Sequence, residues 1–300
     1  MALLEQSCSC TLTVGQFTKK TLACKLVLDD RHTVAYWERR ARPYLQSRRE
    51  ALAVSGTNQP LAVARQLWRL DERGMRQVLR YLPDVGTVLD AGCGPGRWFH
   101  LTAPGRTLVG VDFSPSMVER ARERHPGVEV RVGDLRDLPV PTEGFDGAYT
   151  AKVIQCVPSD QRKIAVSELL RCLVPGGTLV LFEKIRGPDG SLPRDWIAWA
   201  TEAGGSLVTW QGTEYLPLDR VLLAAVAQLR GAISRGSGER GSVPEGVTTH
   251  EPLRSRWGSM FALYGHLRGA ALRISLPLER PFARLLPSDA ATHGIFVFRK

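Results

Sequence analysis

Apolar residues follow two different periods along this chain. In residues 61–82 they recur every three or four positions, which places them on one face of a helix. From residue 83 onward, short apolar runs alternate with turns and with further helical segments. A strand that is apolar at successive positions needs cover on both sides, and helices between parallel strands supply it. The pattern therefore predicts an α/β fold with a doubly wound parallel sheet.

Local boundary signals agree with this pattern. Ser114 followed by Pro115 predicts the start of a helix, because serine caps the first turn and proline fits its first position. Ser159 and Asp160 predict the start of the next helix, which the Pro-Gly-Gly of residues 175–177 would end. The expected strands are residues 87–91, 107–112, 128–132, 146–150, 178–183, 206–210 and 293–300.

About a hundred residues separate the fifth expected strand from the last, which is far more than a crossover needs. Besides the sixth strand they contain helical patterns, a Gly/Ser-rich loop at 235–246 and a turn at 281–286. We interpret this insertion as a cap over the active face of the sheet.

Charge indicates which ligands or surfaces the protein could contact, and the cysteine pattern argues against a metal-binding class. The net charge is +10, and the basic excess lies in residues 1–80 and 254–300. Such flanks either face an anionic ligand or surface or are simply solvated. The six cysteines show no paired metal-ligand spacing, so we expect free thiols and no metal site. Neither a membrane-spanning apolar run nor a secretion signal is present, which predicts a cytoplasmic protein without membrane contact.

The segment VLDAGCGPGRW, residues 88–98, predicts a ligand loop at the end of the first strand. Gly92, Gly94 and Gly96 permit positive φ angles and a close approach of the backbone to a ligand. The next helix would point its amides at negative charge. Arg97 occupies a position where the nicotinamide fingerprint has glycine, which counts against NAD.

Two acids follow at the ends of the next strands. Asp112 ends the second strand, where a carboxylate can accept both hydroxyls of a ribose. Asp134 follows the third strand, where it can accept a hydrogen bond from an exocyclic amine. Together with the glycines, these acids predict a site for a nucleoside cofactor.

Five sequence segments, taken in their order along the chain, resemble those of the class I S-adenosylmethionine-dependent methyltransferases. The blocks are VLDAGCGPG, LVGVDFSPSM, VGDLRDLP, FDGAYTAKVIQCV and LLRCLVPGGTLVLFE, within residues 60–185. The resemblance implies a mostly parallel seven-stranded, Rossmann-like sheet whose last strand, GIFVFRK, is antiparallel. It divides the chain into an N-terminal segment with a helical lid (1–82), a cofactor-binding core (83–185), the sixth strand with a helical substrate cap (186–293) and the last strand (294–300).

The resemblance also implies roles for individual residues. The three glycines would pack on the methionine part of S-adenosyl-L-methionine, and Asp90 would help to hold its ammonium group. Asp112 would bind the ribose and Asp134 the adenine amine. The remaining cofactor contacts implied are Phe113 and Leu135 around adenine, Lys152 after the fourth strand, and Tyr36, Trp37 and Arg40 from an aromatic lid helix.

Catalytic candidates are polar residues at strand ends and in the cap, because an in-line displacement needs a positioned nucleophile and, for some substrates, a base. Glu183 ends the fifth strand and is the first candidate. The others expected are Tyr149, Lys152 and Gln155 after the fourth strand, and Tyr215, His250, Tyr264 and His266 from the cap, with His266 retained as a catalytic candidate.

The predicted function is transfer of a methyl group to a small or medium-sized metabolite, an anionic one being an option, because the Trp-, Tyr- and Leu-rich cap could enclose it. The alternatives are a macromolecular substrate, either RNA or a peptide amine, and an NAD-linked oxidoreductase. Neither the oligomeric state nor a role for residues 1–30 is predicted.

Overall fold

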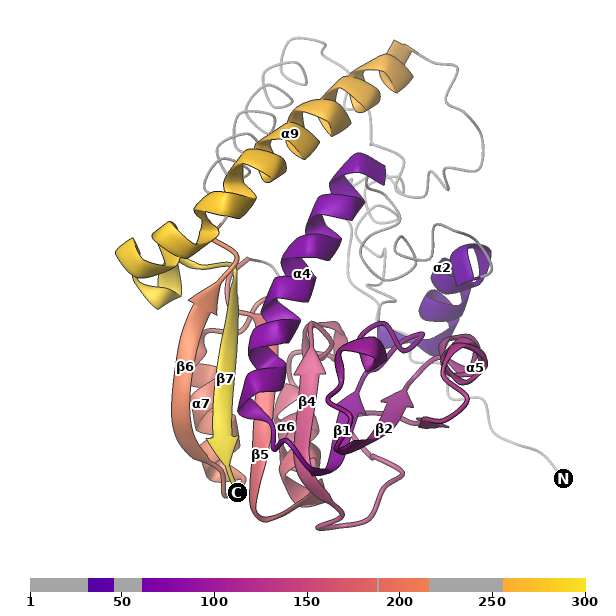
Figure 1. The fold of residues 1–300 in the computed structure, drawn as a ribbon, viewed down its shortest axis with the longest axis vertical. Coiled ribbons are helices and arrows are strands. Elements are labelled where there is room, and N and C mark those ends of the chain that lie inside the picture. The colour runs from indigo at the N-terminus through magenta and orange to yellow at the C-terminus, as the bar shows by residue number, and fades with distance from the viewer. Residues whose placement is uncertain (1–31, 46–60, 188, 216–255) are drawn as a thin grey trace, which may run out of the picture. The chain divides into compact units, whose positions relative to one another are not determined.

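The sheet confirms the predicted fold class. A computed structural model describes residues 32–45, 61–187, 189–215 and 256–300, all within the contact unit Arg31–Lys300. In these residues, seven strands form one sheet in the order β3-β2-β1-β4-β5-β7-β6 (Figure 1). The strands are β1 (Gly86–Ala91), β2 (Arg106–Asp112), β3 (Glu129–Val132), β4 (Phe145–Ala151), β5 (Leu173–Lys184), β6 (Ser206–Thr213) and β7 (His293–Arg299).

One strand, β7, runs opposite to the other six of the sheet. Strands β1 to β5 pair in parallel, whereas β7 is antiparallel to both β5 and β6. The strand order reverses at β1, which lies between β2 and β4. Ligands of open α/β sheets bind beyond the carboxyl ends of the strands at such a reversal.

Helices cover both faces of the sheet. Helices α4 and α5 lie on one face and α6 and α7 on the other, while α9 packs along α4 (Figure 1). The helices are α2 (Val34–Leu45), α4 (Leu61–Tyr81), α5 (Pro115–Arg124), α6 (Arg162–Cys172), α7 (Pro193–Glu202) and α9 (Arg256–Leu285), with short 3-10 turns at Phe99–Leu101, Ile154–Cys156 and Ser288–Ala290.

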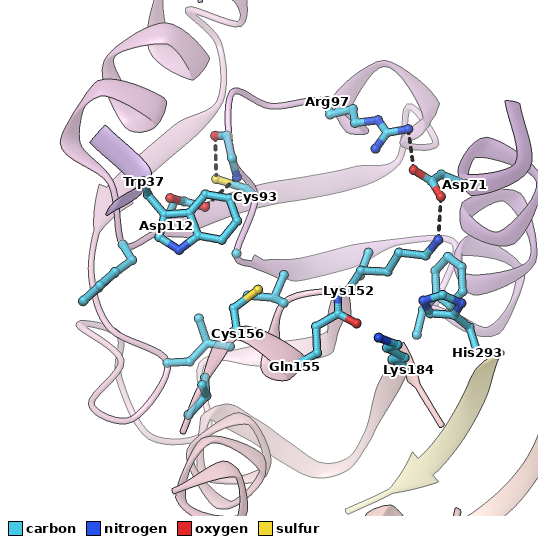
Figure 2. Close-up of a pocket in the computed structure, with 18 of the residues that line it drawn as sticks. Trp37, Asp71, Cys93, Arg97, Asp112, Lys152, Gln155, Cys156, Lys184 and His293 are labelled. Atoms are coloured by element: carbon cyan, nitrogen blue, oxygen red, sulfur yellow. Dashed lines mark hydrogen bonds and ion pairs between the residues drawn. The ribbon is translucent and has the colours of Figure 1, made fainter. Parts of the chain in front are cut away.

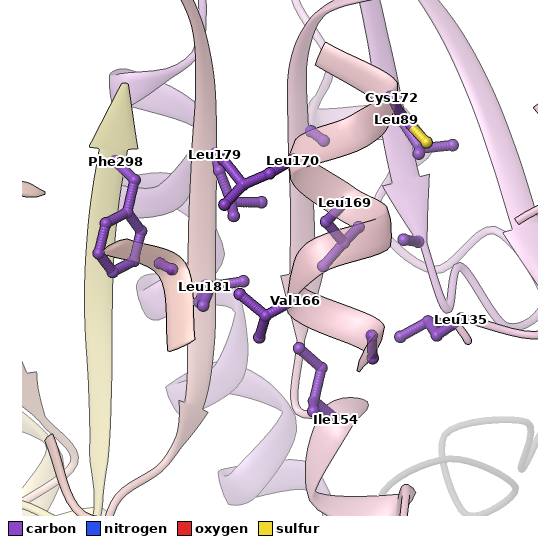
Figure 3. Close-up of a cluster of buried hydrophobic side chains, with 14 of the residues drawn as sticks. Leu89, Leu135, Ile154, Val166, Leu169, Leu170, Cys172, Leu179, Leu181 and Phe298 are labelled. Atoms are coloured by element: carbon purple, nitrogen blue, oxygen red, sulfur yellow. The ribbon is translucent and has the colours of Figure 1, made fainter. Parts of the chain in front are cut away.

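Neighbouring residues of each strand enter different cores, as expected for a sheet buried on both sides. Leu89 and Leu181 pack against Leu169 of α6, in the cluster that Figure 3 shows. Val88 and Val180 instead join the cluster that contains the apolar face of α4. This two-sided burial is the reason why the strands read as continuous apolar runs.

Three predicted boundaries are wrong. Helix α6 begins at Arg162 rather than at Ser159 or Asp160. Strand β5 starts at Leu173, where it pairs with Phe145, so the Pro-Gly-Gly of residues 175–177 lies inside it rather than in a separate turn.

Helix α9 runs through Pro277 and Pro281, so the turn expected at residues 281–286 is instead largely helix. Both prolines are exposed, which allows water to solvate the carbonyl groups that lose a donor. Among the helices of the described ranges, none is both long and apolar enough to cross a bilayer.

Helix α2 is anchored at the start of α5. The carboxylate of Glu38 accepts a hydrogen bond from the Ser114 hydroxyl (2.6 Å) and another from the Ser116 amide (3.0 Å). The amides at a helix N-terminus favour such an anion. This contact seats the predicted lid helix on the turn that follows β2.

Candidate active site

A pocket of about 620 Å³ opens over the carboxyl ends of the parallel strands. Its volume lies within the usual range for sites that enclose a small ligand. Figure 2 shows Trp37, Cys93 and Asp112 at one end, and Asp71, Lys152 and His293 at the other. The lining residues from the strand ends and the loops that follow them are Gly92, Cys93, Gly94, Asp112, Phe113, Asp134, Leu135, Ala151, Lys152, Phe182 and Lys184.

The glycine loop forms the floor of the first end. Gly92 and Gly94 line the pocket with φ angles of 86° and 54°. A Cβ atom on Gly92 would lie 2.4 Å from the methyl groups of Val153, so no other residue fits without displacing that loop. Gly96 is buried and does not line the pocket, and a Cβ atom there would meet Phe99.

Asp112 links this loop to the end of β2. Its carboxylate accepts hydrogen bonds from the amides of Gly94 (2.8 Å) and Ser114 (2.9 Å), and it faces the pocket beside Phe113. Burial raises the pKa of Asp112, and these amide hydrogen bonds oppose that effect. The carboxylate is therefore fixed in place by the backbone that surrounds it.

Asp134 and Leu135 line the pocket after β3. Arg136 donates from Nε to one Asp134 oxygen at 2.9 Å, and its Nη2 lies 2.5 Å from the other. Burial would raise the pKa of Asp134, but the hydrogen bonds and charge of Arg136 outweigh it and the pKa is lowered. An adenine amine would have to share this carboxylate with Arg136.

These residues fit the nucleoside cofactor that the sequence predicts. Gly92 has no side chain and leaves room for a ligand against its backbone. The carboxylates of Asp112 and Asp134 lie at the ends of neighbouring strands. Trp37 of α2 contributes an aromatic surface to the same pocket. Tyr36, expected to contact the cofactor, does not line the pocket and instead packs edge-on against Trp37 at 5.2 Å between ring centroids.

Asp90 and Tyr149 lie beneath the pocket rather than in its lining. Both are buried, and the Tyr149 hydroxyl donates to Asp90 at 2.7 Å. Tyr149, expected as a catalytic residue, therefore does not reach the pocket, because its hydroxyl group is engaged below the glycine loop. Burial raises the pKa of Asp90 to about 7; the nearby charge of Asp112 adds to this, and the Tyr149 hydrogen bond opposes it.

Stability should depend on the ionisation of Asp90. The folded protein holds a proton that the unfolded chain, with a carboxyl pKa near 4, releases. This site therefore favours folding below about pH 4 and loses its contribution as the pH rises through about 7. Relative to Asp90→Asn, we expect the wild-type free energy of unfolding to fall by about 3 kcal/mol between pH 5 and 8 in urea titrations. Exposed Asp160→Asn serves as the control, and parallel curves for wild type and Asp90→Asn would contradict the prediction.

Glu183 also lies outside the pocket. Its buried carboxylate accepts hydrogen bonds from the Thr150 hydroxyl (2.8 Å) and from the amides of Val153 (3.0 Å) and Ile154 (3.1 Å). Burial raises the pKa of Glu183, and those hydrogen bonds oppose the shift. The predicted catalytic placement is corrected: this carboxylate holds the loop after β4, including the residues that line the pocket.

The cap candidates are placed differently from the expectation. His266 of α9 is exposed and does not line the pocket, whereas Arg268 on the same helix does. Tyr215 is buried in the core on the α6 side of the sheet. His250 lies outside the described residues, as do the side chains of Tyr264 and Arg40.

Five charged or titratable side chains join the second end of the pocket into one network. Asp71 of α4 lies 2.8 Å from Arg97 and 2.6 Å from Lys152. Lys152 also lies 2.6 Å from Glu214, whose other oxygen is 2.8 Å from Nδ1 of His293. Figure 2 shows Arg97 and Lys152 reaching Asp71 from different sides. We call these five residues the charged network.

The network shifts the ionisation of its members. Burial would lower the pKa of Lys152, but Asp71 and Glu214 outweigh it and the pKa is raised. Burial would raise the pKa of Glu214, but the neighbouring His293 and Lys152 outweigh it and the pKa is lowered. Lys152 is thus held as a cation and Glu214 as an anion across the neutral pH range.

Apart from Lys152, sequence reasoning did not identify this network as part of the site. One signal was available: Asp71 lies four positions from both Leu67 and Met75, which places an acid on the apolar face of the helix. A carboxylate in such a position requires a buried partner. Glu214 and His293 carry no comparable signal, because sheet pairing brings them together from distant segments.

Known proteins resemble the part of the chain that forms the first end of the pocket. Residues 88–177 match the family described as a methyltransferase domain. Over 109 residues the chain is 38% identical to the probable tRNA methyltransferase 9B of Bos taurus, covering 36% of this chain and 23% of that protein. It is 38% identical over 95 residues to a probable S-adenosylmethionine-dependent methyltransferase of Mycolicibacterium smegmatis, covering 31% of this chain and 36% of that protein.

A further relative covers more of the chain. The malonyl-[acyl-carrier protein] O-methyltransferase of Serratia marcescens is 30% identical over 141 residues, covering 47% of this chain and 52% of that protein. The chain therefore spans from 23% to 52% of the lengths of these relatives.

The antiparallel β7, the glycine loop and the acids at the strand ends define a Rossmann-like methyltransferase fold. The chain carries a domain of the class I S-adenosylmethionine-dependent methyltransferases, whose family match is residues 88–177. The cofactor of this class is S-adenosylmethionine, which replaces the nicotinamide alternative.

Proposed function

We propose that this protein transfers a methyl group from S-adenosylmethionine to a small or medium-sized metabolite. When bound, the cofactor supplies a methyl group on a sulfonium sulfur, and the task of the protein is to hold a nucleophile in line with it. The observation that carries the proposal is the division of the pocket: residues that fit the cofactor line one end, and the charged network lines the other (Figure 2).

The cofactor contacts follow from this division. Asp112 would accept the ribose hydroxyls, and Gly92 and Gly94 would lie under the methionine part. Phe113 and Leu135 would flank the adenine. Trp37 from α2 would cover the cofactor in place of the expected Tyr36.

The remaining lining favours an anionic metabolite. Basic side chains outnumber carboxylates in the lining of this end, which gives the lining a net positive charge. The basic residues are Arg97, Lys152, Lys184 and Arg268, and the carboxylates are Asp71 and Glu214.

The test has two parts. Calorimetric titration should show binding of S-adenosylhomocysteine and none of NADH. With radiolabelled cofactor, label should enter a fraction of small metabolites rather than bulk RNA or peptides. Tight binding of NADH alone would overturn the cofactor assignment, and label in macromolecules would overturn the substrate class.

An RNA substrate is the second candidate, and one surface feature favours it. Exposed arginines recur every three or four positions along α4, so they form one row on the helix surface. Phosphate groups bind such rows with a strong dependence on salt. The row consists of Arg65, Arg69, Arg73, Arg76 and Arg80.

A further inference from the structure

A histidine–carboxylate pair lies in the part of the pocket that the cofactor does not need. His293 is the first residue of β7, and Glu214 directly follows β6, so the antiparallel pairing of these strands brings the two together. His293 lines the pocket, and its side chain is 14% exposed. Nδ1 of the ring lies 2.8 Å from the Glu214 carboxylate.

The nearby carboxylate favours one protonation pattern of the two ring nitrogens, through its charge rather than through a hydrogen bond of good geometry. A carboxylate is negatively charged, so the Nδ1 that faces it carries the proton of a neutral imidazole. Nε2 then has a lone pair that can accept a proton. Within the described residues, no hydrogen bond engages Nε2. The pair therefore presents an oriented base to the pocket.

Burial favours the neutral form of the His293 ring. Burial lowers the pKa of His293 and the ammonium group of Lys152 lowers it further, while Glu214 and the more distant Asp71 oppose the shift. Lys184, which pairs with His293 across β5 and β7, also lines the pocket, and its ammonium group lies 3.5 Å from the carboxylate of Asp189. At neutral pH the imidazole can therefore accept a proton.

We propose that His293 is the general base for a phenolic or enolic hydroxyl substrate, with Glu214 as the residue that positions its ring. This inference rests on the proposed methyl transfer and names the substrate class of that site. A carboxylate nucleophile is already ionised at neutral pH and needs no base. A phenol, with a pKa near that of tyrosine, must lose a proton but lies within reach of an imidazole.

The pocket also suits the charge that develops on such a substrate. Nζ of Lys152 lies 5.1 Å from the centre of the Phe182 ring, and both side chains line the same wall. The Phe182 side chain is only 1% exposed, so its part is to hold this wall, and Lys152 and Lys184 would stabilise the oxyanion of the substrate. These cations favour a phenol or enol, whose oxygen ionises readily, over an aliphatic alcohol.

The step balances without another reagent. The hydroxyl proton passes to Nε2 of His293 as the oxygen forms its bond to the methyl carbon. The bond from that carbon to sulfur breaks, and its electron pair neutralises the sulfonium to a thioether. The imidazolium then returns its proton to water.

The first experiment uses binding rather than turnover. 4-Nitrophenol is added to the protein with S-adenosylhomocysteine, at a pH where the free phenol is protonated. We expect the phenolate absorbance to grow with the wild type and with His266→Gln, an exposed control, but not with His293→Gln. No phenolate with the wild type, or equal phenolate with His293→Gln, would overturn the proposal.

Kinetics supply a second readout. With unsubstituted phenol, His293→Gln should lower kcat by about 10²- to 10⁴-fold with little change in KM, and should move the fall of kcat/KM from the pH at which the imidazole is protonated to the higher pH at which free phenol ionises. Glu214→Gln should shift that fall to lower pH, because the imidazolium loses its anionic partner. A preference for 4-nitroaniline or 4-nitrobenzoate that is independent of His293 would contradict the substrate class.

Calorimetry separates this inference from the proposed function. If S-adenosylhomocysteine fails to bind the wild type, the proposed function itself fails. If it binds the wild type and His293→Gln equally while the phenol ionises in both, only the role of His293 fails.

Discussion

Lys152→Met should destabilise the fold by about 3–5 kcal/mol, the usual cost of removing one partner from a buried ion pair. Lys152 lies between the carboxylates of Asp71 and Glu214, each 2.6 Å away, and its side chain is only 21% exposed. Without the ammonium group, the carboxylates keep Arg97 and His293 alone as partners. Methionine preserves the length of the side chain and leaves the positive φ of 64° at this position as it was, so the measured change reports the charge. Urea denaturation gives the free energy of unfolding.

A surface lysine provides the matched control. Lys163 pairs with Glu202, and both side chains are about half exposed, so Lys163→Met should cost less than about 1 kcal/mol. Adding Glu214→Gln to Lys152→Met should recover part of the loss, because it removes one uncompensated charge. Equal stability of Lys152→Met and Lys163→Met would show that the network contributes nothing to folding.

Asp112→Asn should weaken S-adenosylhomocysteine binding by about 100-fold, because hydrogen bonds to a charged group contribute about 1.5–3 kcal/mol each. Asparagine keeps the size of the side chain, but its NH₂ group cannot accept a hydrogen bond. The amides of Gly94 and Ser114 both donate to the carboxylate, so one of them loses its partner and the loop shifts. Calorimetry measures the affinity.

The stability of the same variant distinguishes binding from folding. Burial raises the pKa of Asp112, so removing the ionised carboxylate relieves a desolvation cost, which offsets the lost amide hydrogen bond and should leave the unfolding midpoint little changed. Asp137→Asn, at an exposed aspartate nearby, should change neither quantity. An unchanged affinity for Asp112→Asn would remove Asp112 from the cofactor site.

The cofactor end was predictable because each of its residues follows a strand within one continuous segment. Gly92, Asp112 and Asp134 come after successive strands, and parallel strands bring their carboxyl ends to one edge. Glu183 shows where this reasoning fails. Phe182 and Lys184 line the pocket, and the residue between them faces the other way because strand side chains alternate. The end of β5 was predicted correctly, but the direction in which the Glu183 side chain points was not.

The cap residues failed for a related reason. Leu272 and Leu276 of α9 pack against α4, and Arg268 lies on the same helix face, four positions earlier. His266 is turned away from that face and is exposed. The helix was predictable from its period, but its rotation about its axis is set by the packing partner, which local sequence does not identify.

The charged network has a consequence for how this enzyme class could acquire new substrates here. Its members come from α4, the glycine loop, the ends of β4 and β6 and the start of β7. The same contacts that shape the substrate end also hold these segments together. A substitution that alters selectivity at Lys152 or Glu214 therefore draws on the stability margin of the whole domain. Variants selected for a new acceptor should first require stabilising changes elsewhere, such as in the hydrophobic contact between α4 and α9.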